Sequence, residues 1–120
     1  MSLLSMILVA LIALLHLYIA WFEMFAWETR GPKVFTIFPK SLFAPTKVMA
    51  ANQGLYNAFL AAGLLWSLLI SDAAWAVNVG LFFCGCVLVA GLYGTATASK
   101  RILYVQALPA LLAVLSLLLT

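Results

Sequence analysis

Residues 3–25 read LLSMILVALIALLHLYIAWFEMF, and this almost unbroken apolar run decides the fold. A helix of this length, rising about 1.5 Å per residue, covers the roughly 30 Å hydrocarbon core of a bilayer. Backbone groups in lipid must be satisfied within their own segment, so we expect a helix and not a strand. We interpret the run as a retained first membrane span, because it lacks the basic start of a secretory signal and is too long for one.

Three further apolar runs follow the first. They cover residues of about 48–70, 75–97 and 102–119. The chain of 120 residues is 68% hydrophobic and 8% charged, whereas a soluble domain carries roughly 25% charged residues. Four spans of about 20 residues leave roughly 40 for loops and ends, which is too few for a separate soluble domain. The sequence therefore predicts a single all-α domain over residues 1–120, an integral membrane four-helix bundle.

Basic residues fall on one side of this predicted bundle. All six Lys and Arg lie in the connection at 26–47 or in the short turn at 99–101, whereas the hairpin at 71–74 carries only Asp72. Cytoplasmic loops of membrane proteins are enriched in Lys and Arg, which predicts that both termini are extracytoplasmic. The same bias accounts for the net charge of +3, so we expect no nucleic-acid partner.

The first connection also contains an apolar run. Residues 34–38 read VFTIF, lie between two prolines and are too few to cross a bilayer. We expect this run to lie at the membrane surface or to fold back against the cytoplasmic mouth of the bundle. The connection is thus predicted to be a long amphipathic loop.

Polar and ionisable side chains gather at the predicted cytoplasmic end of all four runs. Such groups raise the free energy of a membrane span, so we expect each of them to have a structural or functional role. His16 and Glu23 are two turns apart on one face of the first run, and His16 lies about 10 Å deeper. The second run adds an amide-rich patch, and the last two runs add a tyrosine and a glutamine. The predicted cluster comprises His16, Glu23, Asn52, Gln53, Tyr56, Asn57, Tyr93 and Gln106.

Two interpretations of this cluster stay open. A cavity that opens to the cytoplasm, apolar above and hydrogen-bonding below, would suit a small-molecule site. A buried network that only fixes the register of the helices would use the same residue types. His16 is the better candidate for proton transfer, because histidine shuttles protons near neutral pH when a partner such as Glu23 lies within reach.

Small residues predict where helices approach closely. They recur every fourth position in the second run, and a second group lies in the third run. Pro109 has no N–H for the carbonyl of Val105, so it is expected to bend the last helix. The small-residue faces comprise Ala50, Gly54, Ala58 and Ala62 in the second run, and Ala90, Gly91 and Gly94 in the third.

Several classes of site are not expected. Cys84 and Cys86 point about 200° apart on a helix, so we interpret both as small, buried apolar side chains rather than a disulfide. No phosphate-binding loop or dinucleotide-binding fingerprint occurs. One histidine and three carboxylates make a conventional metal site unexpected, and the residues identify no cofactor.

Three segments carry a family resemblance. HLYIAWFEM at 16–24, AANQGLYNAFLAAGLLW at 50–66 and ILYVQALPA at 102–110, with Gly91, Gly94 and Thr97, resemble a bacterial family of small four-span membrane proteins. This family is catalogued as the domain of unknown function numbered 1304. The resemblance implies a multi-pass protein of the bacterial cytoplasmic (inner) membrane and no established activity. The recurring polar positions of the family match the eight residues of the predicted cluster.

Functions of three classes remain open. The favoured one is a module, in membrane lipid and as a possible homo-oligomer through its small-residue faces, that binds or transports a lipophilic or amphiphilic small molecule. The second is an intramembrane enzyme that uses His16 and Glu23 as acid and base on a hydrophobic substrate. The third is a structural or accessory membrane subunit whose polar cluster only specifies packing.

Overall fold

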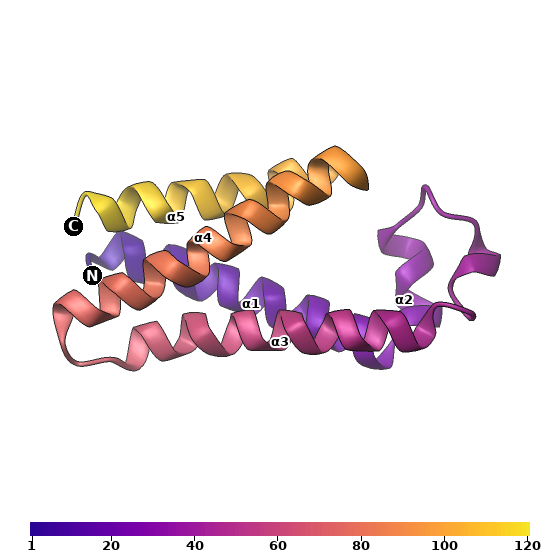
Figure 1. Ribbon diagram of the computed structural model, residues 1–120, viewed down its shortest axis with the longest axis horizontal. Coiled ribbons are helices and arrows are strands. Elements are labelled where there is room, and N and C mark those ends of the chain that lie inside the picture. Colours follow the sequence, from indigo (N-terminus) through magenta and orange to yellow (C-terminus); the bar gives the residue numbers. More distant parts are fainter. The chain divides into compact units, whose positions relative to one another are not determined.

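The computed structural model describes all residues from Met1 to Thr120 and contains helices but no β-strand. The all-α prediction is therefore confirmed. A 3₁₀ turn at Lys40–Leu42 and a π-helical turn at Leu103–Ala107 accompany the α-helices. The five α-helices are α1 (Leu3–Phe25), α2 (Trp27–Val34), α3 (Lys47–Leu69), α4 (Ala73–Thr97) and α5 (Leu108–Leu118) (Figure 1).

The predicted hairpin between the second and third runs connects α3 to α4. Asp72 occupies the N-cap of α4, where its Oδ1 accepts a hydrogen bond of 3.0 Å from the backbone N–H of Trp75. A carboxylate at this position satisfies one of the four N–H groups that lack a partner inside the helix. The lone acidic residue of the hairpin thus defines the start of α4.

Pro109 disturbs the last helix in the manner expected of its missing N–H. The chain forms a π turn at Leu103–Ala107, directly before α5, and the N–H of Leu108 donates to the carbonyl of Leu103 five residues earlier. A π turn has a wider hydrogen-bond pattern, which accommodates a residue that cannot donate in the ordinary α pattern. The bend expected at this proline stays a prediction, and the irregularity that the structure shows is the π turn just before it.

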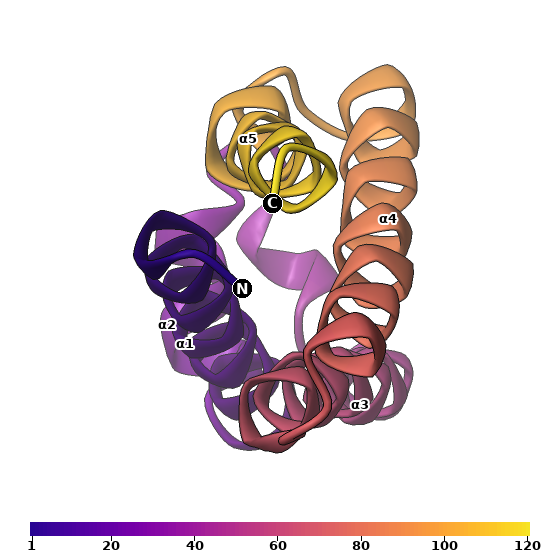
Figure 2. The ribbon, with the colours of Figure 1, turned by 90° about the vertical axis from the view of Figure 1, so that its left-hand side faces the viewer.

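The chain divides into two compact units, each described by itself. The first unit comprises Met1–Leu14 and Leu60–Thr120, and the second comprises residues 15–59. In the first unit, α4 contacts both the π turn and α5 (Figure 2). Its core is built from small and branched apolar side chains of α1, α3, α4 and α5, namely Val9, Ile12, Ala13, Leu64, Cys84, Val87, Ala110, Ala113 and Leu117.

Gly91 is where α4 approaches the π turn most closely. A Cβ atom added there would lie 2.7 Å from the backbone nitrogen of Ala107 and 2.8 Å from its Cα. These are backbone atoms that cannot rotate away, so only glycine fits. The predicted close approach is confirmed at Gly91, and Gly94 packs against Ile102, whereas Ala90 is exposed.

On α3 the small residues predicted to pack against another helix are buried at the start of the helix but not at its end. Ala50 and Gly54 are buried, but Ala62 is exposed and Ala61 is buried in its place. A step of four residues advances slightly more than one turn of 3.6, so the face drifts by about one residue after three steps. Cys84 is buried as expected, whereas Cys86 is only half-buried, and both thiols are free.

The N-terminal part of α1 and the C-terminal part of α5 are joined by hydroxyl groups. The Oγ atoms of Ser5 and Ser116 lie 2.6 Å apart, and Ser5 also accepts a 3.0 Å hydrogen bond from the hydroxyl of Ser2. The side chain of Ser5 is fully buried. In an apolar surrounding these hydroxyls satisfy one another, which holds the two helix ends together (Figure 2).

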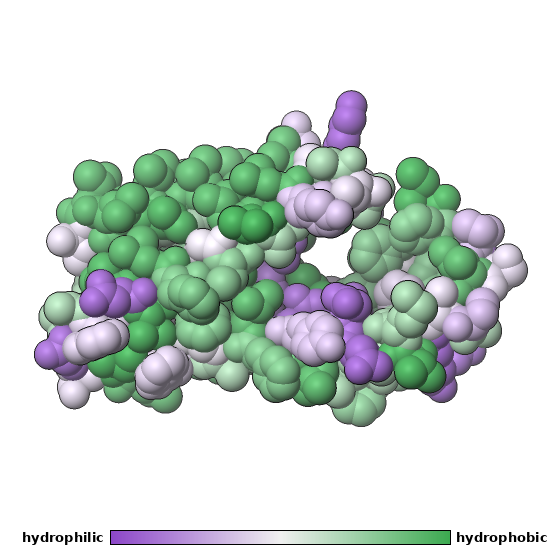
Figure 3. Space-filling model, viewed as in Figure 1, coloured by the Kyte–Doolittle hydropathy of each residue, from purple (hydrophilic) through white to green (hydrophobic).

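Large apolar side chains cover much of the surface. Hydrophobic residues dominate the visible face of α4 and α5 (Figure 3), and Leu11, Phe82 and Leu118 are each more than half exposed. Two helices, α1 and α4, are long and apolar enough to cross a membrane by length and composition. α3 has 23 residues, but its amide-rich patch lowers its hydropathy, and the helical stretch Leu103–Leu118 is shorter.

Candidate functional site

The site begins with a close approach of α1 and α3 inside the second unit. A Cβ atom added to Gly54 would lie 2.6 Å from Cγ of Met24 and 3.0 Å from the carbonyl oxygen of Ala20. The glycine therefore lets the two helix backbones nearly touch. This contact brings short polar side chains on α3 within reach of α1.

One turn beyond Gly54, α1 and α3 are joined by a short side-chain hydrogen bond. Nδ2 of Asn57 donates to Oε1 of Glu23 over 2.6 Å, and it also lies 3.2 Å from the carbonyl oxygen of Gln53. A hydrogen bond to a carboxylate is shorter and stronger than one between neutral groups. The bond uses one carboxylate oxygen, which leaves Oε2 as the oxygen that can accept a proton or a hydrogen bond from a ligand.

The rest of the polar patch on α3 is exposed. The amide of Asn52 donates to the carbonyl oxygen of Val48 in its own helix over 2.9 Å. Gln53 and Tyr56 are exposed, and the ring of Tyr56 contacts that of Phe59 at a centroid distance of 6.3 Å. The structure thus brings Asn57 to Glu23, whereas Asn52, Gln53 and Tyr56 present their side chains on the outside of α3.

The remaining predicted residues are placed differently. His16 lies on α1 two turns before Glu23 and is fully buried. Tyr93 and Gln106 belong to the first unit. Tyr93 is 72% exposed, and Gln106 is half-buried in the π turn. The grouping of all eight side chains into one site stays a prediction.

Residues 26–47, predicted from the sequence to be a loop, contain a small folded element. Its core is a cluster of rings: Trp27 lies 6.3 Å from Phe22, 5.8 Å from Phe35 and 5.0 Å from Phe43 between centroids. Phe22 and Phe43 are almost completely buried. Phe35 packs onto the end of α1, where its ring lies 6.2 Å from that of Phe22 between centroids. The two alternatives for the VFTIF run, at the membrane surface or against the mouth of the bundle, stay predictions.

Short contacts fix this aromatic cluster in place. Gly31 on α2 lies so close to Phe43 that an added Cβ would be 2.7 Å from the ring. Nε1 of Trp27 donates to Oγ1 of Thr46 over 2.9 Å. The sequence did contain a signal for α2, since WETRGPKV has an acidic residue in its first turn and a basic one in its last.

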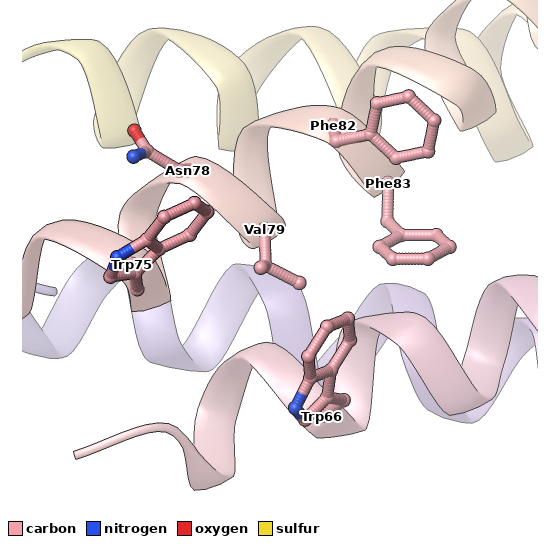
Figure 4. Close-up of a pocket in the computed structure, with 6 residues that line it drawn as sticks. All are labelled: Trp66, Trp75, Asn78, Val79, Phe82 and Phe83. Carbon is pink, nitrogen blue, oxygen red and sulfur yellow. The ribbon is translucent and has the colours of Figure 1, made fainter. Parts of the chain in front are cut away.

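Two surface grooves belong to the first unit, and neither is lined by Glu23 or Asn57. The first measures about 270 Å³ and lies between α3 and α4, where Trp66 of α3 projects toward Val79 and Phe83 of α4 (Figure 4). The second measures about 770 Å³ and follows α4 from Leu81 to Tyr93. Both are lined almost entirely by apolar side chains, so they lack convergent polar groups that would orient a ligand.

Comparison with known proteins gives the family. Residues 10–118 match the profile of the family described as "Protein of unknown function (DUF1304)". The chain belongs to the DUF1304 family. It is also 34% identical over 118 residues to the uncharacterized protein YpaA of Lactococcus lactis subsp. lactis (strain IL1403), which covers 97% of this chain and 98% of that relative. No solved structure matches the chain.

Membership in DUF1304 confirms the resemblance drawn from the sequence. The matched range runs from the middle of α1 to the end of α5 and includes all eight residues of the predicted cluster. The function of the family is not characterised, so the family supplies no activity for Glu23, Asn57 or the aromatic cluster.

A double-mutant cycle on the DUF1304 chain tests whether the hydrogen bond between Glu23 and Asn57 couples α1 to α3. We expect Glu23→Ala and Asn57→Ala to show a coupling of about 1–2 kcal/mol in unfolding free energy, because the bond is short and partly buried. Unfolding in detergent of increasing denaturing strength measures it. Asn52→Ala, whose amide bonds only to its own helix, is the matched control and should not couple to Glu23→Ala.

Proposed function

We propose that this chain is a four-span integral protein of the bacterial cytoplasmic membrane that binds a lipophilic or amphiphilic small molecule at the cytoplasmic ends of α1 and α3. The four spans are α1, α3, α4 and the helical stretch from Leu103 to Leu118, with both termini outside the cytoplasm. The observation that carries the proposal is the carboxyl group of Glu23, which accepts a hydrogen bond from Asn57 where α1 and α3 approach closely.

Exposure supports lipid as the surrounding solvent. In the most apolar windows of α1 and α4, 33% and 28% of the residues are buried, whereas a core helix of a soluble protein is mostly buried. Exposed leucines and phenylalanines over so much of two long helices would be unfavourable in water. Lipid removes that cost, because its tails are as apolar as the side chains.

Charge supports the orientation. Three basic residues lie in the segment between α1 and α3, Lys47 begins α3, and two more lie in the turn after α4, whereas the hairpin between α3 and α4 has only Asp72. Under the bias of Lys and Arg toward the cytoplasm, the first and third connections face inward and the hairpin, which is the second, faces outward. Glu23, in the last turn of α1, and Asn57, about three turns after Lys47 on α3, then lie near the inner leaflet.

Single cysteines test the orientation. In a chain with Cys84→Ser and Cys86→Ser, we place one thiol at Ser41 before α3 and the other at Ser71 in the hairpin, both exposed positions. A membrane-impermeant maleimide added to intact cells stripped of their wall should label Ser71→Cys and spare Ser41→Cys until the membrane is broken. The opposite pattern would reverse the orientation, and labelling of both would contradict the four spans.

The chemistry at Glu23 indicates which ligand class to test. A carboxylate with one oxygen committed to Asn57 favours a head group that donates hydrogen bonds or carries positive charge. Exposed Gln53 and Tyr56 on the neighbouring surface of α3 can add donors and acceptors, and the apolar helix surface beyond them suits an alkyl chain. An alkylammonium such as dodecylammonium combines these features and serves as the probe.

Binding of dodecylammonium to the protein in lipid nanodiscs, corrected for empty nanodiscs, tests the ligand site. We expect Glu23→Gln to raise the dissociation constant about tenfold or more, because a charge-assisted contact is lost. Glu28→Gln is the matched control, since Glu28 is an exposed carboxylate that pairs with Lys47, and it should change binding less than about twofold. Equal effects of the two variants would leave Glu23 and Asn57 with a packing role only.

A further inference from the structure

We propose that the folded segment between α1 and α3, residues 26–46, is a docking surface for the head groups of anionic phospholipids. The inference rests on the proposed membrane location and adds a lipid class to it. One side of this segment does not pack into the aromatic cluster and is exposed. Residues 36–42 are all exposed, and Ile37 is exposed to 70%.

The segment is held in a fixed shape, so its charges have fixed places. Gly31 is packed against the ring of Phe43, and Trp27 is bonded to Thr46. On α2 the residues at 27, 31 and 34 are buried or half-buried, whereas Glu28, Thr29, Arg30 and Lys33 are exposed. One side of α2 therefore faces the aromatic cluster, and the other carries polar and basic groups outward.

The basic residues are unequally engaged. Lys47 pairs with Glu28 at 3.4 Å, and the guanidinium of Arg30 lies 5.9 Å from the centre of the Tyr18 ring. Lys33 and Lys40 form no ion pair and are exposed. The segment thus carries an excess of positive charge, with two lysines available for anionic groups outside the protein.

Apolar side chains flank Lys40 along the chain. Ile37, Phe38 and Leu42 are exposed on the same stretch as Lys40. In water the two lysines are hydrated, but the exposed side chains of Ile37, Phe38 and Leu42 have no apolar partner. At a membrane surface these apolar side chains enter the boundary between head groups and acyl chains, while Lys33 and Lys40 reach the phosphates.

The experiment measures the dissociation constants of dioleoylphosphatidylglycerol and dioleoylphosphatidylcholine on the detergent-solubilised full-length chain by native mass spectrometry. We expect the wild type to prefer phosphatidylglycerol, and the preference to fall with added salt. Lys40→Gln should reduce the preference for phosphatidylglycerol up to about fivefold, because each cation near an anionic surface contributes a factor of about five to binding. The double variant Lys33→Gln with Lys40→Gln should reduce this preference up to about 25-fold.

Lys100→Gln is the matched control, because Lys100 is an exposed lysine in the turn after α4, outside the segment. We expect it to change the preference less than about twofold. Equal affinity for the two lipids, or an equal effect of Lys100→Gln and Lys40→Gln, would overturn the assignment. The exposed residues 36–42 would then be expected to bind another partner, such as a cytosolic protein. The maleimide labelling above is independent, so a membrane-spanning chain without lipid preference contradicts only this inference.

Discussion

Replacing Phe43 by alanine should release the segment at residues 26–46 from the ends of α1 and α3. The Phe43 ring is 1% exposed, lies 5.0 Å from the Trp27 ring and contacts Gly31. Truncating a buried phenylalanine costs about 3–5 kcal/mol, because apolar contacts are lost and a cavity remains. Phe43 packs against Gly31 and Trp27, which belong to the same segment, so the cost should fall on this segment.

Trypsin reports that release. The bond after Arg30 lies inside α2 and precedes buried Gly31, so it is cut only when α2 opens. If opening is fast relative to cleavage, a loss of about 3 kcal/mol raises the cleavage rate at this bond about 100-fold or more. Mass spectrometry of the fragment that ends at Arg30 measures the rate.

Phe25→Ala is the matched control. Phe25 ends α1 near the same segment but is 76% exposed, so its truncation should change cleavage after Arg30 by less than about threefold. A similar rate for Phe43→Ala and the wild type would mean that the aromatic cluster does not hold α2 in place.

Replacing Gly91 by alanine should destabilise the first unit. Its added methyl would meet the backbone nitrogen and Cα of Ala107 at 2.7 and 2.8 Å, so α4 and the π turn must move apart. Overpacking of this kind costs about 1–3 kcal/mol, even after the gain in helix propensity of alanine over glycine. Unfolding of the full chain in detergents of increasing denaturing strength measures the loss.

Gly85→Ala on the same helix is the control for propensity. A Cβ atom at Gly85 meets no atom within 4 Å, so this variant should be unchanged or more stable by up to about 1 kcal/mol. We therefore expect Gly91→Ala to lower the free energy of unfolding and Gly85→Ala to leave it unchanged or raise it. Equal stabilities would contradict the close approach at Gly91.

The small residues of α3 and α4 show that sequence spacing predicts only in part which positions face another helix. Gly85 and Gly91 lie in one apolar run and have similar neighbours along the chain, yet only Gly91 faces a helix backbone. Sequence spacing pointed to Gly91 and Gly94 correctly, but it placed Ala62 on a packed face that the structure leaves exposed. A pattern along one helix does not specify how far the contact with another helix extends.

The candidate site was reached only in part from the sequence. Polar residues in apolar runs identified Glu23 and Asn57, because such residues are rare in spans and need partners. Their direct bond depends on the close approach at Gly54, which joins residues 34 positions apart. The same approach leaves Gln53 and Tyr56 exposed, a difference that residue type alone does not predict.

The sequence by itself determined the helical class, the apolar runs and the one-sided distribution of charge, because hydropathy and chain length act locally and need no partner. Tertiary structure decided which residues meet: Asn57 with Glu23, Gly91 with Ala107, and the rings of Phe22, Trp27, Phe35 and Phe43 around α2. Those contacts join segments distant along the chain, and whether they form depends on how side chains from different helices fit together.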